Sequence, residues 1–176
     1  RYFKGKDFGS HLEEGKKLLQ AYHESFSGDD LEVLAIEEPF CFTAEGLDVP
    51  VIGAFDLVEQ DASGTVIVSD FKTTSRAYSS DEIDRNFQMT LYGLAVKAKG
   101  YSDREVLLRL DCIVKTKSPR LDQHYTARTE SDERRALTKM QLVWDGIPKG
   151  VFVPNDNSWK CMGCGYKSYC EEALVA

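Results

Sequence analysis

The sequence predicts an α/β protein in which a mixed β-sheet is flanked by helices. The first observation is the order of the expected elements: a helix, three strands, a helix, a strand and a helix. The second is the turn signal Asp61-Ala62-Ser63-Gly64 between two β-branched apolar runs, which indicates a hairpin. The third is size, because 176 residues that are 42% hydrophobic suffice for a single core. We therefore predict one domain over residues 1–176, with 155–176 as a C-terminal cysteine segment.

The individual elements follow from hydrophobic periodicity. Leu18, Leu19 and Tyr22 predict an amphipathic helix over 15–26. The capping box Ser79-Ser80-Asp81-Glu82 predicts the start of one helix of about five turns that Gly100 closes. The other predicted elements are strands over 34–43, 51–58, 65–72 and 106–115 and a helix over 132–147. The polar segments 76–80 and 118–123 are expected to be loops that face the substrate.

The register of the hairpin places two acidic side chains opposite each other. A three-residue loop with Gly64 in the left-handed conformation pairs position 61 with 65, so that Asp56 faces Asp70. Asp70 and Lys72 are two residues apart and point to the same side, whereas Phe71 points to the other. A loop longer or shorter by one residue would send the two carboxylates to opposite faces.

Two facing carboxylates indicate a cation site. They repel by a few tenths to ~1 kcal/mol unless a cation lies between them. Hard oxygen ligands favour Mg²⁺ or Mn²⁺, which lower the pKa of bound water and neutralise charge on a phosphate. Lys72 would orient that water or stabilise the developing negative charge. Taken alone, Asp-x-Lys is also typical of a surface charge pair.

Three motifs together resemble a known family. Gln88 and Tyr92 share one face of the predicted helix. Gly53-x2-Asp56, Asp70-x-Lys72 and Gln88-x3-Tyr92, in that order, resemble the PD-(D/E)XK nuclease superfamily and specifically its RecB-like exonuclease branch. The resemblance implies a restriction-endonuclease-like core over most of the chain. It also implies the following roles: catalysis by Asp56, Asp70 and Lys72; metal binding by Asp56, Asp70 and the Phe71 carbonyl; and DNA contact by Gln88 and Tyr92, to which we add Thr73 and Arg76.

The family's first helix carries a metal-binding histidine. His11 lies near the expected place and is a further candidate ligand, although its surroundings, Gly9-Ser10-His11-Leu12-Glu13, match the motif loosely. A solvated histidine at a helix start is the alternative.

Three cysteines near the C-terminus predict a second metal centre. Cys161, Cys164 and Cys170 have the spacing Cys-x2-Cys-x5-Cys, and thiolates select zinc or iron–sulfur clusters. The spacing resembles the iron–sulfur branch of the family, which includes the Cas-four and AddB-type nucleases, and implies a 4Fe–4S cluster, with zinc as the alternative. Its fourth cysteine lies far upstream, so we expect an N-terminal part of the native protein to be absent. Cys41 and Cys112 are expected to be buried structural thiols.

Net charge and the distribution of basic residues bear on whether the protein binds nucleic acid. The net charge of −7 argues against a nonspecific nucleic-acid coat. Basic residues nevertheless gather in two groups that could form a path for DNA: Lys115, Lys117, Arg120 and Arg128, and then Arg134, Arg135 and Lys139. The leading hypothesis is a cytoplasmic metal-dependent DNA exonuclease with no membrane segment, acting on single-stranded ends in repair, recombination or CRISPR adaptation. A helicase or CRISPR integrase partner is left open. The alternatives are a catalytically idle DNA-binding scaffold and a zinc-containing adaptor.

Overall fold

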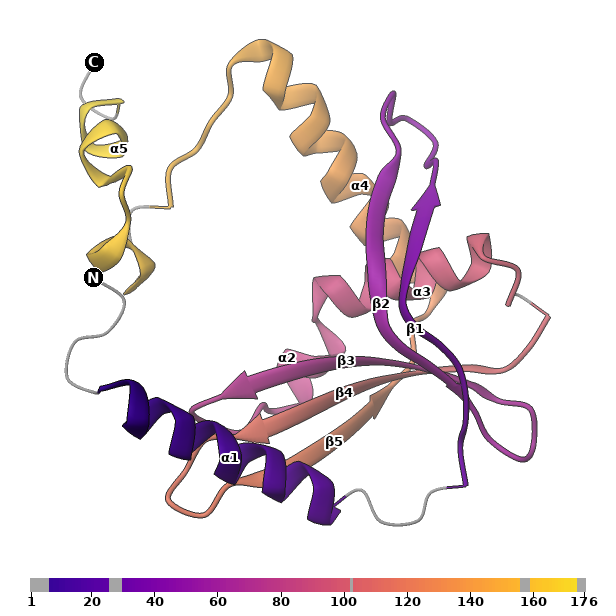
Figure 1. Ribbon diagram of the computed structural model, residues 1–176. Coiled ribbons are helices and arrows are strands. Elements are labelled where there is room, and N and C mark those ends of the chain that lie inside the picture. Colours follow the sequence, from indigo (N-terminus) through magenta and orange to yellow (C-terminus); the bar gives the residue numbers. More distant parts are fainter. Residues whose placement is uncertain (1–6, 26–29, 102, 156–158, 174–176) are drawn as a thin grey trace. The chain divides into compact units, whose positions relative to one another are not determined.

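A computed structural model of the protein describes residues 7–25, 30–101, 103–155 and 159–173 (Figure 1). By their contacts these residues form two compact units, Arg1–Thr138 and Lys139–Ala176, and each unit is described by itself.

The first unit is built on a five-stranded mixed sheet with the order β1-β2-β3-β4-β5. Neighbouring strands are antiparallel except β3 and β4, which are parallel. This arrangement confirms the predicted fold class, a mixed sheet flanked by helices. The strands are β1 (Glu32–Phe42), β2 (Val51–Gln60), β3 (Val66–Thr74), β4 (Val106–Val114) and β5 (Arg120–Thr126).

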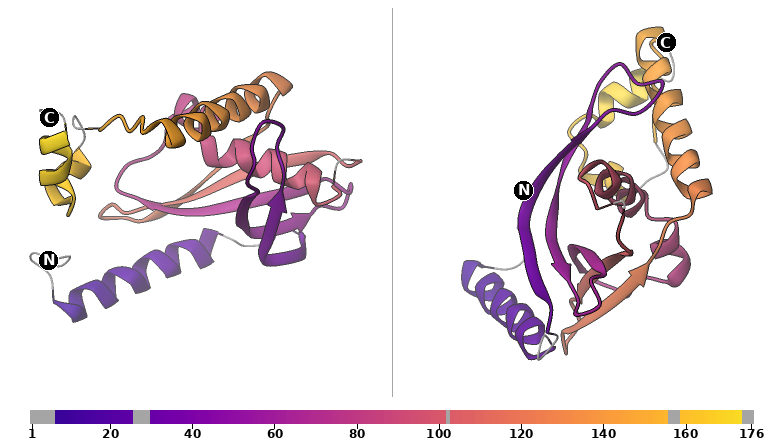
Figure 2. Two further views of the ribbon diagram at one scale, coloured as in Figure 1. Left: turned by 90° about the horizontal axis from the view of Figure 1, so that it is seen from above. Right: turned by 90° about the vertical axis from the view of Figure 1, so that its right-hand side faces the viewer.

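Helices cover both faces of the sheet (Figures 1 and 2). Helix α3 (Phe87–Ala98) contacts β1 and β4 and buries Met89, Tyr92 and Ala95 against the apolar residues of the strands. Helix α1 (Phe8–Ser25) contacts β5 and β4 on the other face. Strand β3 is buried from Val66 to Asp70 because it lies in the middle of the sheet beneath these two layers.

The helical crossover between β3 and β4 differs from the prediction. Instead of one helix from the capping box to Gly100, there are two, α2 (Ser80–Asp84) and α3. The capping box itself is present, with Glu82 N donating to Ser79 Oγ at 3.3 Å. The helical conformation is interrupted at Arg85 and Asn86. The Asn86 side chain caps the second helix by accepting a hydrogen bond from Met89 N at 3.2 Å.

The segment expected to be a substrate-facing loop over 118–123 is largely a strand. Strand β5 starts at Arg120, and Leu121 pairs with Ile113 of β4. The prediction was wrong because β5 has few apolar residues, and its alternation is visible only against the neighbouring strand. Two other boundaries also shift: α1 starts at Phe8 rather than at position 15, and position 26 lies outside the described residues.

Helix α4 (Glu130–Gly146) begins in the first unit and ends in the second. It is followed by a short helical turn, η1 (Ile147–Lys149), where Gly150 adopts a left-handed φ of 67° and Val151 N donates to Gly146 O at 3.0 Å. The cysteine segment contains η2 (Trp159–Gly163) and α5 (Lys167–Ala173).

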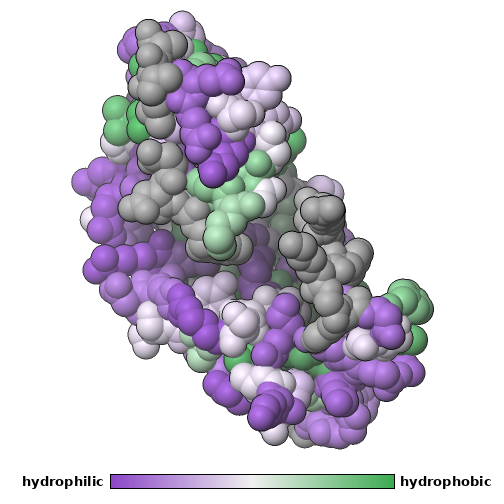
Figure 3. Space-filling model, turned by 90° about the vertical axis from the view of Figure 1, so that its left-hand side faces the viewer, coloured by the Kyte–Doolittle hydropathy of each residue, from purple (hydrophilic) through white to green (hydrophobic). Residues whose placement is uncertain are grey.

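Polar residues dominate the surface drawn in Figure 3, where hydrophobic residues form small separate groups. None of the helices in the described ranges combines the length and the hydrophobicity that crossing a membrane requires.

Candidate active site

The hairpin of β2 and β3 has the predicted register. Leu57 pairs with Ser69 and Gln60 with Val66, and Asp61 N donates to Thr65 O at 3.1 Å. Gly64 closes the loop with a φ of 90°, a conformation that glycine adopts without steric cost. Continuing the same register places position 56 opposite position 70, as the three-residue loop requires.

Asp56 lies where the two strands separate. The regular ladder ends at the pair of Leu57 and Ser69, and beyond it Asp56 Oδ2 accepts a hydrogen bond from Phe71 N at 2.8 Å. The Asp56 carboxylate thus accepts the hydrogen bond of a main-chain N–H beyond the last strand pair, and this contact holds it beside Phe71. On the other edge of β2, Glu37 lies across from Asp56 and has a φ of 50°, a left-handed value that is uncommon outside glycine.

Asp70 is almost fully buried, with 1% of its surface exposed, and its Oδ1 is hydrogen-bonded by helix α3. Gln88 Nε2 donates to Asp70 Oδ1 at 2.7 Å and to the Tyr92 hydroxyl at 3.2 Å. The Tyr92 hydroxyl lies 2.9 Å from Ala54 O and 3.3 Å from Asp70 Oδ1, so its proton serves these two acceptors. Two α3 residues and a β2 carbonyl therefore fix the orientation of the Asp70 carboxylate.

The other oxygen of Asp70 faces Lys72. Lys72 Nζ lies 2.5 Å from Asp70 Oδ2, and the lysine side chain is 35% exposed, so the ion pair lies at the edge of the core. Phe71 points to the opposite face, as predicted, where its ring makes an edge contact with Tyr22 of α1 at 5.9 Å. Burial raises the pKa of Asp70, while the neighbouring Lys72 opposes this change and the charge of Asp56 adds to it.

The glycine of the first motif has a packing role. The Phe40 ring covers Gly53 so closely that a Cβ at position 53 would lie 2.4 Å from Phe40 Cζ. The Phe40 ring in turn packs against the Phe55 ring in a tilted arrangement, with centroids 4.8 Å apart, and meets the Tyr92 ring edge-on at 6.0 Å. The absence of a side chain at Gly53 therefore allows an aromatic cluster to form beside Asp56.

The predicted DNA contacts lie in different surroundings. Thr73 is exposed one residue past Lys72. Arg76 is exposed, but its guanidinium pairs with both carboxylate oxygens of Glu82, one of them at 2.8 Å, and also donates to Ala77 O at 3.0 Å. Arg76 therefore closes the loop onto the capping box of α2. Gln88 is also exposed, whereas Tyr92 is buried.

Of the basic residues that were predicted to form a DNA path, two have internal partners. Arg120 pairs with Asp122 on its own strand, at 2.9 Å. The Arg128 guanidinium donates to protein oxygens of the surrounding elements, so its five N–H groups are already used within the fold.

His11 is half-buried on α1. Within the described ranges, no three His, Cys, Asp or Glu side chains converge as a metal-binding group, so His11 does not complete a three-ligand set with Asp56 and Asp70.

The same finding applies to the cysteines. Cys161, Cys164 and Cys170 are present as free thiols that do not form a three-ligand group in the described part of the chain. Cys161 Sγ donates to Asn155 O at 3.2 Å. Of the two cysteines expected to be buried, Cys112 is buried, and burial raises its pKa to about 11. The prediction for Cys41 was wrong, because it lies on the exposed face of β1, across from the exposed Ile52.

Two facing carboxylates, a buried hydrogen-bond frame and an adjacent lysine agree with the family that the motifs resemble. A model of the PD-(D/E)XK nuclease superfamily matches residues 3–171. The chain belongs to the PD-(D/E)XK nuclease superfamily. No curated protein sequence matches it at a significant level.

Two crystal structures share the superfamily fold with this chain. One is a protein of Eubacterium rectale that is named provisionally as an exonuclease, with a TM-score of 0.58 and 10% identity over 95% of this chain. The other is the protein SSO0001, with a TM-score of 0.54 and 15% identity over 93% of this chain and 71% of its own length. This chain spans 63% of the length of the E. rectale protein. At these identities the similarity establishes the fold.

Sequence reasoning missed two parts of the site. The Ala54 carbonyl, which receives the Tyr92 hydroxyl, is a main-chain group with no sequence signal. The Phe40 ring over Gly53 could have been suspected from a glycine inside a strand, which often marks close approach of another group.

Proposed function

We propose that this member of the PD-(D/E)XK superfamily is a divalent-metal-dependent DNA exonuclease that hydrolyses phosphodiester bonds at single-stranded ends. The observation that carries the proposal is the position of Asp70, a buried carboxylate with Asp56 opposite it in register and Lys72 beside it. The name of the E. rectale protein supports the exonuclease assignment.

The residues present fit a hard divalent cation. Asp56, Asp70 and the main-chain carbonyl of Phe71 are oxygen donors, which Mg²⁺ and Mn²⁺ prefer. Asp70 Oδ2 is buried and is held by Lys72 Nζ at 2.5 Å, so a divalent cation would bind this oxygen by displacing the lysine ammonium. When bound, the cation would lower the pKa of a coordinated water and neutralise charge on the phosphate.

The protein's own side chains have distinct tasks in this proposal. Gln88 and Tyr92 hold Asp70 Oδ1 and so leave Oδ2 facing Lys72. The Phe71 N–H holds Asp56 in the same way. Lys72 extends from the buried pair toward solvent, where its ammonium would orient the attacking water or stabilise the negative charge that develops on the phosphate.

DNA with a free end is the proposed partner, with Thr73, Arg76 and Gln88 as the exposed contact residues. Repair, recombination or CRISPR adaptation in the cytoplasm is the proposed setting, and it rests on the RecB-like spacing of the motifs. For DNA to use Arg76, the guanidinium would exchange Glu82 for a phosphate, which the exposure of the pair permits.

We keep an iron–sulfur cluster on Cys161, Cys164 and Cys170 as a separate proposal. Its support is the spacing of three soft ligands. The three thiols do not converge as a ligand group among the described residues, and the nuclease proposal above does not use the cluster. Iron and sulfide analysis of anaerobically purified protein tests the proposal, and zinc without iron would replace the cluster by a zinc site.

Cleavage of end-labelled single-stranded DNA in Mg²⁺ or Mn²⁺ tests the nuclease proposal. We expect stepwise degradation by the wild type and a loss of about 100-fold or more in Lys72→Ala, because an electrostatic group beside the reacting phosphate is removed. Lys97→Ala is the matched control, since Lys97 pairs with Glu133 at 2.7 Å on the far part of α3. DNA binding without metal-dependent cleavage by the wild type would assign a scaffold role instead.

A further inference from the structure

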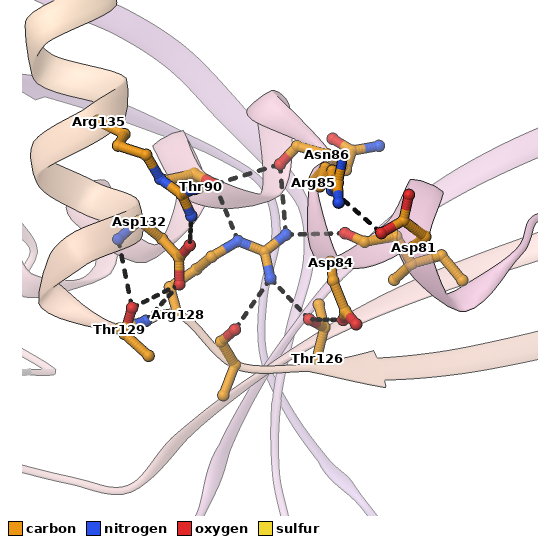
Figure 4. A network of polar contacts seen from close by, with 12 residues as sticks. Asp81, Asp84, Arg85, Asn86, Thr90, Thr126, Arg128, Thr129, Asp132 and Arg135 are labelled. Carbon is orange, nitrogen blue, oxygen red and sulfur yellow. Dashed lines mark hydrogen bonds and ion pairs between the residues drawn. The ribbon is translucent and has the colours of Figure 1, made fainter.

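Arg128 lies between β5 and α4 at the centre of a network of polar contacts (Figure 4). The network, called the joint below, connects β5 with α2 and α3. A guanidinium has five N–H donors, and here each has an acceptor. Nε donates to Thr90 Oγ1 at 2.8 Å. Nη1 donates to Thr126 Oγ1 at 2.6 Å and to Ala127 O at 2.9 Å. Nη2 donates to Ile83 O at 2.9 Å and to Asn86 O at 3.3 Å.

All five acceptors are neutral oxygens. The two nearby carboxylates are engaged elsewhere, because Asp84 accepts from Thr126 Oγ1 at 3.0 Å and Asp132 accepts from Thr129 Oγ1 at 2.7 Å. Burial lowers the pKa of Arg128. A lysine has three donors at one point and could not reach acceptors on both sides of the joint. The arrangement therefore requires a planar, forked cation.

The joint contacts the end of α2 and the start of α3. Helix α2 has five residues, which is too short for a stable helix by itself, and Arg128 binds the Ile83 carbonyl near its end. Arg128 also binds the cap residue Asn86 and the first-turn residue Thr90. Gln88 lies between these two residues, and its amide reaches Asp70 Oδ1 at 2.7 Å.

We propose that Arg128 is a positioning residue for the Asp70 site: it fixes the first turn of α3, which sets the Gln88 amide and through it the Asp70 carboxylate. The proposal rests on the proposed function in that Asp70 is taken to bind a divalent cation. Partners that orient a metal-binding carboxylate change metal affinity by about 10- to 100-fold when they are removed.

Mn²⁺ binding without DNA tests the proposal directly. Electron paramagnetic resonance of free Mn²⁺ gives the Kd for the wild type, Arg128→Lys, Gln88→Ala and the double variant. We expect Arg128→Lys to weaken binding about 10-fold and to have no further effect in the Gln88→Ala background, because both changes release the same carboxylate. Arg85→Lys is the matched control, since Arg85 lies in the same joint but is exposed and pairs with Asp81 at 3.0 Å.

An equal loss from Arg128→Lys in both Gln88 backgrounds would indicate a general structural effect and overturn the proposal. So would unchanged Mn²⁺ affinity in Arg128→Lys, or no Mn²⁺ binding by the wild type. The milder variant Thr90→Val removes the acceptor of Nε and the hydrogen bond from Thr90 Oγ1 to Asn86 O, but leaves the other four Arg128 contacts in place, and so guards against misfolding. We expect a smaller loss of Mn²⁺ affinity that also vanishes in Gln88→Ala.

Kinetics separate this inference from the nuclease proposal. In an active enzyme, Arg128→Lys should lower kcat for end-labelled DNA and leave KM unchanged, because the residue makes no contact with substrate. Coupled Mn²⁺ binding by a protein that does not cleave DNA would retain the role of Arg128 and reject the nuclease. Normal DNA cleavage, together with an Arg128→Lys effect on Mn²⁺ affinity that is the same with and without Gln88, would retain the nuclease and reject the role of Arg128.

Discussion

The two faces of the sheet each bury an aspartate, and the aspartates lie on neighbouring parallel strands. Asp70 of β3 faces α3 and is 1% exposed, whereas Asp111 of β4 lies on the α1 face and is fully buried. Burial raises the pKa of both carboxyls. The two sites differ in the cation that balances this cost.

On the α1 face the cation is a fully buried arginine. Arg109 Nη2 donates to Glu59 Oε2 at 2.7 Å, and Nε donates to Asp111 Oδ2 at 3.1 Å. Gln123 donates to the second oxygen of Asp111 at 3.1 Å. This cluster ties β2, β4 and β5 together across the sheet. A guanidinium locked between two carboxylates has a structural role.

On the α3 face the cation is a lysine that is one-third exposed and contacts one oxygen of Asp70. A flexible ammonium can move aside for a metal ion or a phosphate, whereas the buried guanidinium cannot leave without exposing two charges. The same charge pairing therefore stabilises the fold on one face and would serve the chemistry of the proposed nuclease on the other.

Removing each cation is the strongest test of this comparison. Arg109→Met should lower the free energy of unfolding by about 3–5 kcal/mol, because it removes the cation that balances the buried charges of Glu59 and Asp111. Lys72→Met should cost at most about 1–2 kcal/mol, since Asp70 keeps the Gln88 and Tyr92 hydrogen bonds. Urea unfolding followed by circular dichroism measures both.

Adding Glu59→Gln and Asp111→Asn to Arg109→Met should recover most of its loss. Equal losses for Arg109→Met and Lys72→Met would remove the distinction between the two faces.

Two glycines, one in the aromatic cluster beside Asp56 and one on α1, extend the comparison of the two faces to packing. Gly53→Ala should lower the free energy of unfolding by about 1–3 kcal/mol, because the new Cβ would overlap the Phe40 ring. Gly15→Ala on α1 should be neutral or stabilise by up to about 1 kcal/mol, since its Cβ would meet no atom within 4 Å and the position is helical. Thermal unfolding gives both values. Phe40→Leu should relieve part of the Gly53→Ala defect; no relief would place the strain elsewhere.

The smallest expected effect is a difference in pH dependence between a buried and an exposed carboxylate without metal. The folded state raises the pKa of Asp70 above 3.8, so the stability of the wild type relative to Asp70→Asn should fall as the pH rises through 3.8 to the raised pKa. Hydrogen bonds from Arg76 and Ser79 lower the pKa of Glu82 from 4.5 to about 2. Stability relative to Glu82→Gln should therefore be present above pH 4.5 and fall toward pH 2. Urea titrations in EDTA measure both slopes, and slopes of the same sign would contradict the assignment.

The sequence alone determined the local geometry of the candidate site. The loop Ala62-Ser63-Gly64 is short, and Gly64 takes the left-handed conformation that fixes the register, so Asp56 and Asp70 had to lie opposite each other. Alternation along one strand likewise set Lys72 beside Asp70 and Phe71 on the other face. These relations depend on backbone geometry within about 20 residues, and motif spacing records that geometry directly.

Only the tertiary structure decided how the site is held and which charges are free to act. Asn86, which caps α3, is held through its carbonyl by Arg128, a residue 42 positions later in the sequence, and the Gln88 contact with Asp70 lies in the turn that follows. Folding also gave Arg128, one of the basic residues that could have lined a DNA path, internal hydrogen-bond partners, and it made the polar segment that begins at Arg120 a strand. Such contacts join residues that are far apart in the sequence. No local sequence pattern identifies the partners, which come together only when the helices pack on the sheet.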